Sequence, residues 1–248
     1  DPAFYATLDD GDIVTDTFVV RGVGLAWNPG GQLRSGDDFV TVSIEIEGVC
    51  FTAGTRIATP DGPVPVEDLK PGDLVCTRDN GAQPVRAIDM AYIDGGRLAK
   101  SPELRPIRIG RGALRPGSPA RDLRLSPQHR VLISGPDVEL LFGVSEALVP
   151  AKTLTCREGV EIDDTANGVT YSHLLLSGHE ILDAEGVPAE SLFLGEEALA
   201  RMGSDALLEL AAIFPARSSG TSEGFGQAAR LILKDHEARL LATTAMPV

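Results

Sequence analysis

Three groups of residues in this chain have types and spacing that could do chemistry. Cys50 follows an alternating, strand-like run and begins the segment Cys50-Phe-Thr-Ala-Gly-Thr55. A thiol at that position can attack the carbonyl carbon of Val49, the preceding residue, through a five-membered ring. The attack would convert an amide into a thioester, and it needs a base for the thiol and a proton donor for the leaving nitrogen. A buried, inert cysteine is the competing interpretation of Cys50 alone.

The second group is Ser126 and His129, in the segment Leu125-Ser-Pro-Gln-His129 after a predicted strand. A hydroxyl three residues before a histidine can aim both side chains at one peptide. His129 could protonate the leaving nitrogen, because imidazole can carry a donor proton near neutral pH. Ser126 could orient His129 or bond the scissile peptide. By itself this pattern is more typical of a turn serine and a satisfied histidine.

The third group is His173 and His179, which lie six residues apart and could face a common site. A metal would need a third close ligand, and none is obvious in the sequence. The cysteines Cys50, Cys76 and Cys156 form no C-x-x-C pair, and their odd number is a poor disulfide framework. We therefore expect no metal and no cofactor.

Composition limits the classes of protein to which the chain can belong. Its 248 residues include 22 Lys and Arg against 36 Asp and Glu, a formal net charge of −14, which argues against nucleic-acid binding. The apolar runs fall short of the roughly 20 residues of a membrane span. No signal peptide pattern is present, and the first residue is Asp1, so we expect a fragment or a processed product.

Turn residues divide the chain into short segments that must position these groups. With 27 Gly, 17 Pro and only 5% aromatic residues, short strands are expected rather than long helices. Strands are predicted at 16–21, 39–47, 55–58, 64–66, 74–77, 84–88, 121–125, 130–133, 139–142, 169–176 and 180–182. Residues 95–121 look like a long insertion. Beyond residue 191 the pattern predicts helices over 204–214 and 227–243, joined by a linker over 216–224.

Four segments, taken in order, resemble a known family. They are Cys50-Phe-Thr-Ala-Gly-Thr-Arg-Ile-Ala-Thr-Pro-Asp-Gly62, Val66-Glu-Asp-Leu-Lys-Pro-Gly-Asp-Leu-Val75, Ser126-Pro-Gln-His129 and the stretch Tyr171–Ser191. This ordered set looks like the Hint module of inteins and hedgehog autoprocessing domains, in its bacterial intein-like form. The resemblance covers residues 50–191.

The resemblance implies an all-β, pseudo-two-fold horseshoe of short strands at residues 50–191. Residues 1–49 would then be a β-rich N-terminal flanking segment, and residues 192–248 a C-terminal helical extension. The flanking segment would be the module's own substrate, and cleavage would fall at the Val49–Cys50 bond.

The resemblance also implies roles for individual residues. Cys50 matches the cysteine of the N-to-S acyl shift, and Ser126 and His129 match a T-x-x-H element in which Ser keeps the hydroxyl of Thr. Asp89 is matched to an aspartate of hedgehog-type members and is a candidate base for the thiol. His179 matches the upstream histidine of the intein tail.

The end of the module departs from the splicing pattern. Inteins that splice end with His-Asn, whereas Glu190-Ser191 stands there in this chain, and no Asn follows Asn167. Asn cyclisation, and with it ordinary splicing, is not expected. The thioester would be resolved by water or by an external small or protein nucleophile, freeing residues 1–49.

Two other interpretations remain open at this stage. The chain could be a Hint-like structural module that does not cleave, in a secreted or surface protein. It could also be a Cys–His hydrolase of other molecules, although Cys50 lacks the helix N-terminus that commonly activates such a thiol. A secreted or cell-surface location is the expectation for the self-cleaving form as well.

Overall fold

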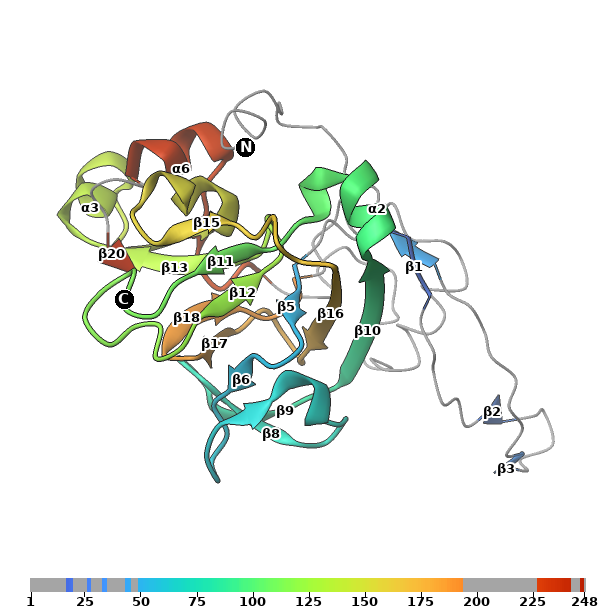
Figure 1. The fold of residues 1–248 in the computed structure, drawn as a ribbon. Helices are drawn as coiled ribbons and strands as arrows, with labels where there is room; N and C mark the ends of the chain where they lie inside the picture. The colour runs from blue at the N-terminus through green and yellow to red at the C-terminus, as the bar shows by residue number, and fades with distance from the viewer. Residues whose placement is uncertain are drawn as a thin grey trace.

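The computed structural model describes residues 49–193 and 227–241, together with the course of a few short strands elsewhere. Those strands are β1 (Thr17–Val19), β2 (Ala26–Trp27), β3 (Leu33–Arg34), β4 (Ser43–Glu45) and β20 (Met246–Pro247). β1 and β4 lie within the predicted strands 16–21 and 39–47 and pair antiparallel. The helix and linker predicted over 204–214 and 216–224 lie outside the described residues. The described part is mostly β, in agreement with the predicted class (Figure 1).

One sheet carries the start of the Cys50 segment at its centre. Its strand order is β10-β16-β5-β12-β11-β15. The strands are β5 (Phe51–Thr52), β10 (Ala87–Asp94), β11 (Ile107–Ile109), β12 (Leu123–Leu125), β15 (Val160–Ile162) and β16 (Gly168–Leu175). The long strands β10 and β16 run side by side, with β5 beyond β16 (Figure 1). Because β5 has a neighbour on each side, the chain enters the sheet at an interior position.

A second, larger sheet contains the tail of the module. Its main path is β19-β14-β13-β18-β17-β6-β7, and β8, β9 and β20 pair alongside it. The strands are β6 (Arg56–Ile57), β7 (Val64–Pro65), β8 (Leu74–Thr77), β9 (Gly81–Pro84), β13 (Arg130–Ser134), β14 (Glu146–Pro150), β17 (Ile181–Ala184), β18 (Val187–Glu190) and β19 (Leu231–Ile232). Apolar side chains of both sheets, among them Phe51, Leu125 and Leu182, share one core.

The predicted insertion over 95–121 begins with two short helical turns that cover Cys50. They are α2 (Gly95–Lys100), which Asp94 caps by accepting the N–H of Arg97, and the 3₁₀ turn η2 (Pro102–Leu104). Leu98 and Leu104 are buried in a cluster that also contains Cys50. The insertion therefore takes part in enclosing Cys50.

One strand prediction was wrong. Residues 139–142 belong to the helix α3 (Pro136–Phe142). Proline at its first turn and Gly143 in the left-handed conformation (φ 69°) after its last residue mark it as a helix. The prediction failed because a four-residue apolar run does not distinguish a strand from a helix.

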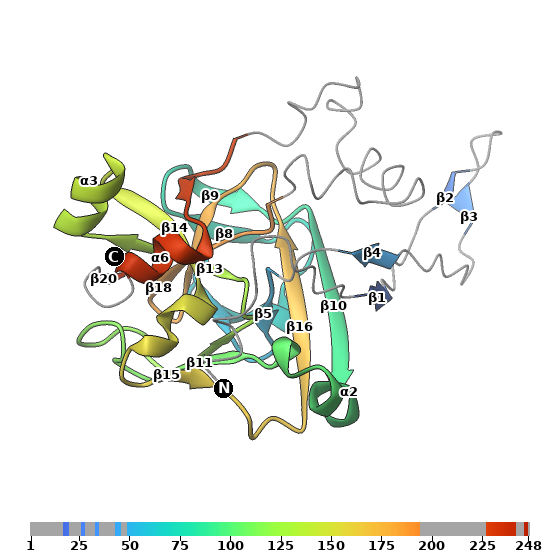
Figure 2. The ribbon, with the colours of Figure 1, turned by 90° about the horizontal axis from the view of Figure 1, so that it is seen from above.

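The predicted C-terminal helix is shorter than the 227–243 expected. Leu231 and Ile232 form β19, which pairs in parallel with β14, and the helix α6 spans Asp235–Leu241. Glu237 caps its start by accepting the N–H of Lys234. For Leu231 and Ile232, which precede that cap, pairing with the open edge of β14 is more favourable than joining the helix. Figure 2 shows α6 beside β14, and its buried Ala238 and Leu241 belong to the shared core. None of the helices in the described segments is long and apolar enough to cross a membrane.

Candidate active site

The peptide bond between Val49 and Cys50 is buried where the chain enters the first sheet. Val49 is 6% exposed and Cys50 is fully buried. Cys50 packs with the apolar side chains Ile93, Leu98 and Tyr171. A thiol in these surroundings is reached from within the protein far more readily than by an outside substrate.

Strand register aligns four polar residues across this sheet. Asp89 pairs with His173 between β10 and β16. Ser172 of β16 pairs with Phe51 of β5, so the next pair in that register is His173 with Cys50. Leu125 of β12 pairs with Phe51 on the other side, so the next pair there is Ser126 with Cys50. We call Asp89, His173, Cys50 and Ser126 the transverse row. Since directly opposite residues of antiparallel strands share a face, the row concentrates these groups at the Val49–Cys50 peptide.

Ser126 holds the peptide nitrogen of Cys50. The N–H of Cys50 donates to the Ser126 hydroxyl oxygen at 2.9 Å, and the N–H of Ser126 donates to the Cys50 carbonyl at 3.0 Å. The N–H of His129 donates to the Ser126 carbonyl at 3.1 Å and closes the Ser-Pro-Gln-His turn. The turn thus fixes the position of Ser126 relative to the Val49–Cys50 peptide, at which the sequence predicts cleavage.

His129 is fully buried beside the same residue. Its ring lies 4.3 Å from the ring of Phe51, centre to centre, and its two nitrogens have no hydrogen-bond partner among the described residues. Burial lowers the pKa of His129 from 6.5 to about 4, although the nearby charge of Glu190 and the Cys50 carbonyl oppose that change. His129 is therefore a neutral imidazole near pH 7.

His173 contacts both groups that an acyl shift would bring together, the Val49 carbonyl and the Cys50 thiol. Its Nδ1 lies 2.9 Å from the carbonyl oxygen of Val49, and its Nε2 lies 3.2 Å from Sγ of Cys50. It is 4% exposed, and burial lowers its pKa to about 4 against the opposing hydrogen bond with Val49. The sequence pattern suggests for His173 only a common site with His179, and these contacts with Val49 and Cys50 were missed. No local signal gives them, because the pairing of β16 with β5 places His173 opposite Cys50.

Asp89 lies across the strand pair from His173, at the end of the transverse row away from Ser126. With strands about 4.8 Å apart, two strand spacings separate the backbones of Asp89 and Cys50. The imidazole of His173 occupies the position between them. Asp89 is thus the cross-strand neighbour of His173.

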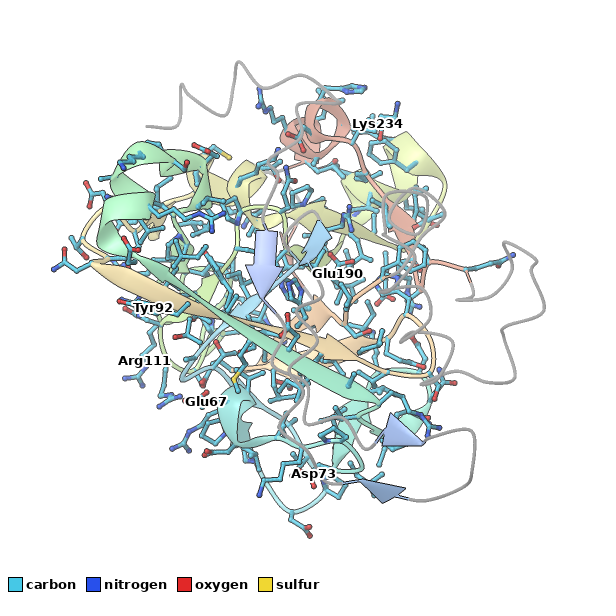
Figure 3. All side chains as sticks on the ribbon, turned by 90° about the vertical axis from the view of Figure 1, so that its right-hand side faces the viewer. Glu67, Asp73, Tyr92, Arg111, Glu190 and Lys234 are labelled. Atoms are coloured by element: carbon cyan, nitrogen blue, oxygen red, sulfur yellow. The ribbon has the colours of Figure 1, made fainter. Side chains whose placement is uncertain are left out.

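His179 contacts a buried carboxylate instead of the scissile peptide. Its Nε2 lies 3.0 Å from Oε2 of Glu190, and its Nδ1 accepts the N–H of Ala229 at 3.1 Å. Glu190 is fully buried and also accepts the N–H of Arg130 at 2.9 Å. Burial alone would raise the pKa of Glu190, but Arg130 and His179 hold it below 4.5. Figure 3 shows Glu190 inside the molecule, whereas Asp73 lies at its periphery.

Within residues 49–193 and 227–241, no three or more His, Cys, Asp or Glu side chains come together as a metal site would require. His173 and His179, considered above as ligands, have different partners. His173 contacts Val49 and Cys50, whereas His179 contacts Glu190 and Ala229. The two histidines therefore do not form a common site.

Comparison with known proteins places this site in a family. Residues 49–196 match the family model of the Hint domain. Among solved structures, a bacterial intein-like domain from Clostridium thermocellum is 14% identical, with a TM-score of 0.35, over 58% of this chain and 98% of that one. The gp41-1 intein is 11% identical (TM-score 0.35; 56% and 96% covered), and the MchDnaB-1 intein is 12% identical (TM-score 0.36; 57% and 99% covered). No curated protein matches.

The family match begins at Val49, the residue before Cys50, and runs past Ser191. It covers more than half of the 248 residues and includes each of the segments on which the resemblance was based. Hint domains are generally associated with self-processing. The chain belongs to the Hint domain family.

Proposed function

We propose that this chain cleaves itself between Val49 and Cys50 by an N-to-S acyl shift. The observation that carries the proposal is the pair of hydrogen bonds between Cys50 and Ser126, one of which holds the nitrogen that would leave. Sγ of Cys50 attacks the Val49 carbonyl and forms a thioester. Water or an external nucleophile then releases the upstream segment.

His129 is proposed to assist the departure of the nitrogen. With a pKa of about 4, His129 is neutral near pH 7, so it acts as a neutral hydrogen-bonding group and not as a protonated imidazolium acid. Its ring interacts with the backbone of Cys50, an interaction that opposes the lowering of its pKa, so it is near enough to engage this peptide as the geometry at nitrogen changes. His179 would support the site indirectly, through Glu190.

Ordinary splicing is not part of the proposal. Glu190 and Ser191 stand at the tail, and Glu190 is held by Arg130 and His179 in a buried network. The complete burial of Cys50 disfavours hydrolysis of other molecules. The pseudo-two-fold horseshoe arrangement and a secreted or surface location are further parts of this proposal, to be tested by an experimental structure and by cell fractionation.

Mass spectrometry of the purified chain, incubated with hydroxylamine, tests the proposed function. The expected products are residues 1–49 carrying a hydroxamate on Val49 and a fragment that begins with Cys50. Cys50→Ala should abolish both products, whereas the matched controls Cys76→Ala and Cys156→Ala should retain them. A chain that stays intact under these conditions, with Cys50 unmodified, would instead support the non-cleaving structural module.

A further inference from the structure

His173 bridges the nucleophile and its target with one imidazole ring. Nδ1 is 2.9 Å from the Val49 oxygen, and Nε2 is 3.2 Å from Sγ of Cys50. An ordinary packed histidine would need only one such contact. Sγ also lies 3.7 Å from Nδ1, so the thiol lies against the ring near both nitrogens and closer to Nε2, while Nδ1 is the nitrogen nearest to the carbonyl oxygen.

The chemistry of the two partners fixes the tautomer. The Val49 carbonyl oxygen can only accept, so Nδ1 of His173 carries the hydrogen. In a neutral ring Nε2, the nitrogen nearer to Sγ, then carries the lone pair, and it can take the thiol hydrogen of Cys50 as the thiol moves toward the plane of the ring. The ring is neutral near pH 7, because its pKa is lowered to about 4 by burial.

We propose that His173 is the catalytic base of the acyl shift and also the hydrogen-bond donor to the developing oxyanion. This inference rests on the proposed self-cleavage and assigns the residue that starts it. Asp89 acts on the thiol through His173, as a positioning residue, because the imidazole lies between them in the transverse row.

The step balances within the site. The Sγ–H bond of Cys50 breaks and its proton passes to Nε2 of His173, while Sγ forms a bond to the carbonyl carbon of Val49. The carbonyl π electrons move to oxygen, where the N–H at Nδ1 stabilises them. When the C–N bond breaks, its electron pair stays on the nitrogen of Cys50, which takes the proton back from Nε2. The products are a thioester, a free amine and a neutral imidazole.

The charge changes during this step favour His173 over His129 as the catalytic base. A neutral imidazole that takes up the thiol proton becomes a cation, and a cation donates more strongly to the oxyanion at Nδ1. The carboxylate of Asp89, opposite His173 on the same face, stabilises that cation. His129 also lies near His173 and weakly opposes a positive charge on it.

Two substitutions of His173 separate its two roles. Asn keeps an N–H that can reach the Val49 oxygen but has no base, whereas Ala removes both functions. With excess hydroxylamine near pH 7, we expect His173→Asn to slow cleavage by about 10²–10⁴-fold. His173→Ala should be slower still, because one oxyanion donor contributes about 10²–10³-fold. His236→Asn, at an exposed position of α6, is the matched control and should cleave at the wild-type rate.

The pH dependence distinguishes a lost base from a damaged fold. Without His173 the thiol of Cys50 must ionise by itself, and the ionised fraction of a thiol rises about tenfold per pH unit below its pKa. The ratio of the wild-type rate to the His173→Asn rate should therefore fall about tenfold per pH unit between about pH 7 and pH 8. A constant ratio, or equal rates, would overturn the role of His173 and leave self-cleavage standing. Failure of the wild-type chain to cleave in a Cys50-dependent manner would overturn both proposals.

The tautomer can be measured without any change to His173. In the uncleavable Cys50→Ala chain, nitrogen-15 NMR should show His173 protonated at Nδ1 near pH 7, with a pKa well below 6.5. Asp89→Asn in the same chain should lower that pKa further, because a facing negative charge is lost. The opposite tautomer, with the proton at Nε2, would refute the proposal even if the His173 variants failed to fold.

Discussion

Acidification to about pH 5 should destabilise this protein before its carboxylates begin to titrate. His129 and His173 each have a pKa lowered by burial from 6.5 to about 4. A lowered histidine pKa contributes stability that is fully present above the unfolded pKa and is lost as the pH falls toward the folded one. The carboxylate of Glu190, whose pKa is lowered from 4.5, acts only at more acidic pH.

The magnitude follows from these pKa values. Between about pH 7.5 and pH 5 an unfolded histidine gains most of a proton, while the folded one stays neutral. Each pKa unit corresponds to about 1.4 kcal/mol, so each of the two histidines should cost about 2 kcal/mol of unfolding free energy over that range. Together they should cost about 4 kcal/mol, which corresponds to a fall of roughly 8–16 °C in melting temperature.

Urea denaturation of the Cys50→Ala chain at the two pH values measures this loss without interference from cleavage. His129→Gln and His173→Asn should each remove about half of the pH dependence. His236→Asn, at an exposed position, should leave it unchanged. The reasoning would be refuted if the unfolding free energy of the Cys50→Ala chain fell by less than about 1 kcal/mol between the two pH values. It would also be refuted if the full fall of about 4 kcal/mol remained after both buried histidines were replaced.

Three further predictions rest on single contacts. Glu190→Ala leaves its buried partners uncompensated and should lower the unfolding free energy by about 3–5 kcal/mol in urea titrations, whereas the exposed control Glu158→Ala should have little effect. Ser126→Ala deprives the Cys50 N–H of its acceptor and should slow cleavage by ~10–10²-fold by gel assay, with Ser126→Thr closer to wild type. Gly168→Ala would place a methyl group against the hydroxyl of Tyr92 in a backbone conformation (φ 157°) that L residues rarely adopt, and should lower the melting temperature, a loss that Tyr92→Ala should relieve only in part.

The parts of the site that depend on local sequence could be predicted. Cys50 and the turn from Ser126 to His129 are short motifs, and the neighbouring strands β5 and β12 bring them together. The contribution of His173 could not be predicted in this way, because it depends on the pairing of β16 with β5 across more than a hundred residues. Neither propensity nor periodicity sets such a register; the global packing of the sheet does.

Errors in the fold have a similar origin. The strand expected over 139–142 is a helix because Pro136 and Gly143, just outside the predicted range, set its ends. The C-terminal helix loses its first residues to β19, because an unpaired edge of β14 was available to them. In both cases the deciding contact lay outside the segment from which the prediction was made.

The parallel pairing of β19 with β14 has a practical consequence for the borders of the folding unit. The family match ends at residue 196, yet Leu231 and Ile232 cover an edge of the second sheet and α6 completes its core. A protein cut at the family border would expose the backbone N–H and C=O groups of β14 as an open edge, which readily pairs with other chains. Such a fragment should self-associate, whereas a fragment extended through residue 241 should stay monodisperse during gel filtration. Residues 231–241 thus protect the protein against aggregation by covering the edge of β14, and proteins prepared for expression studies should include them.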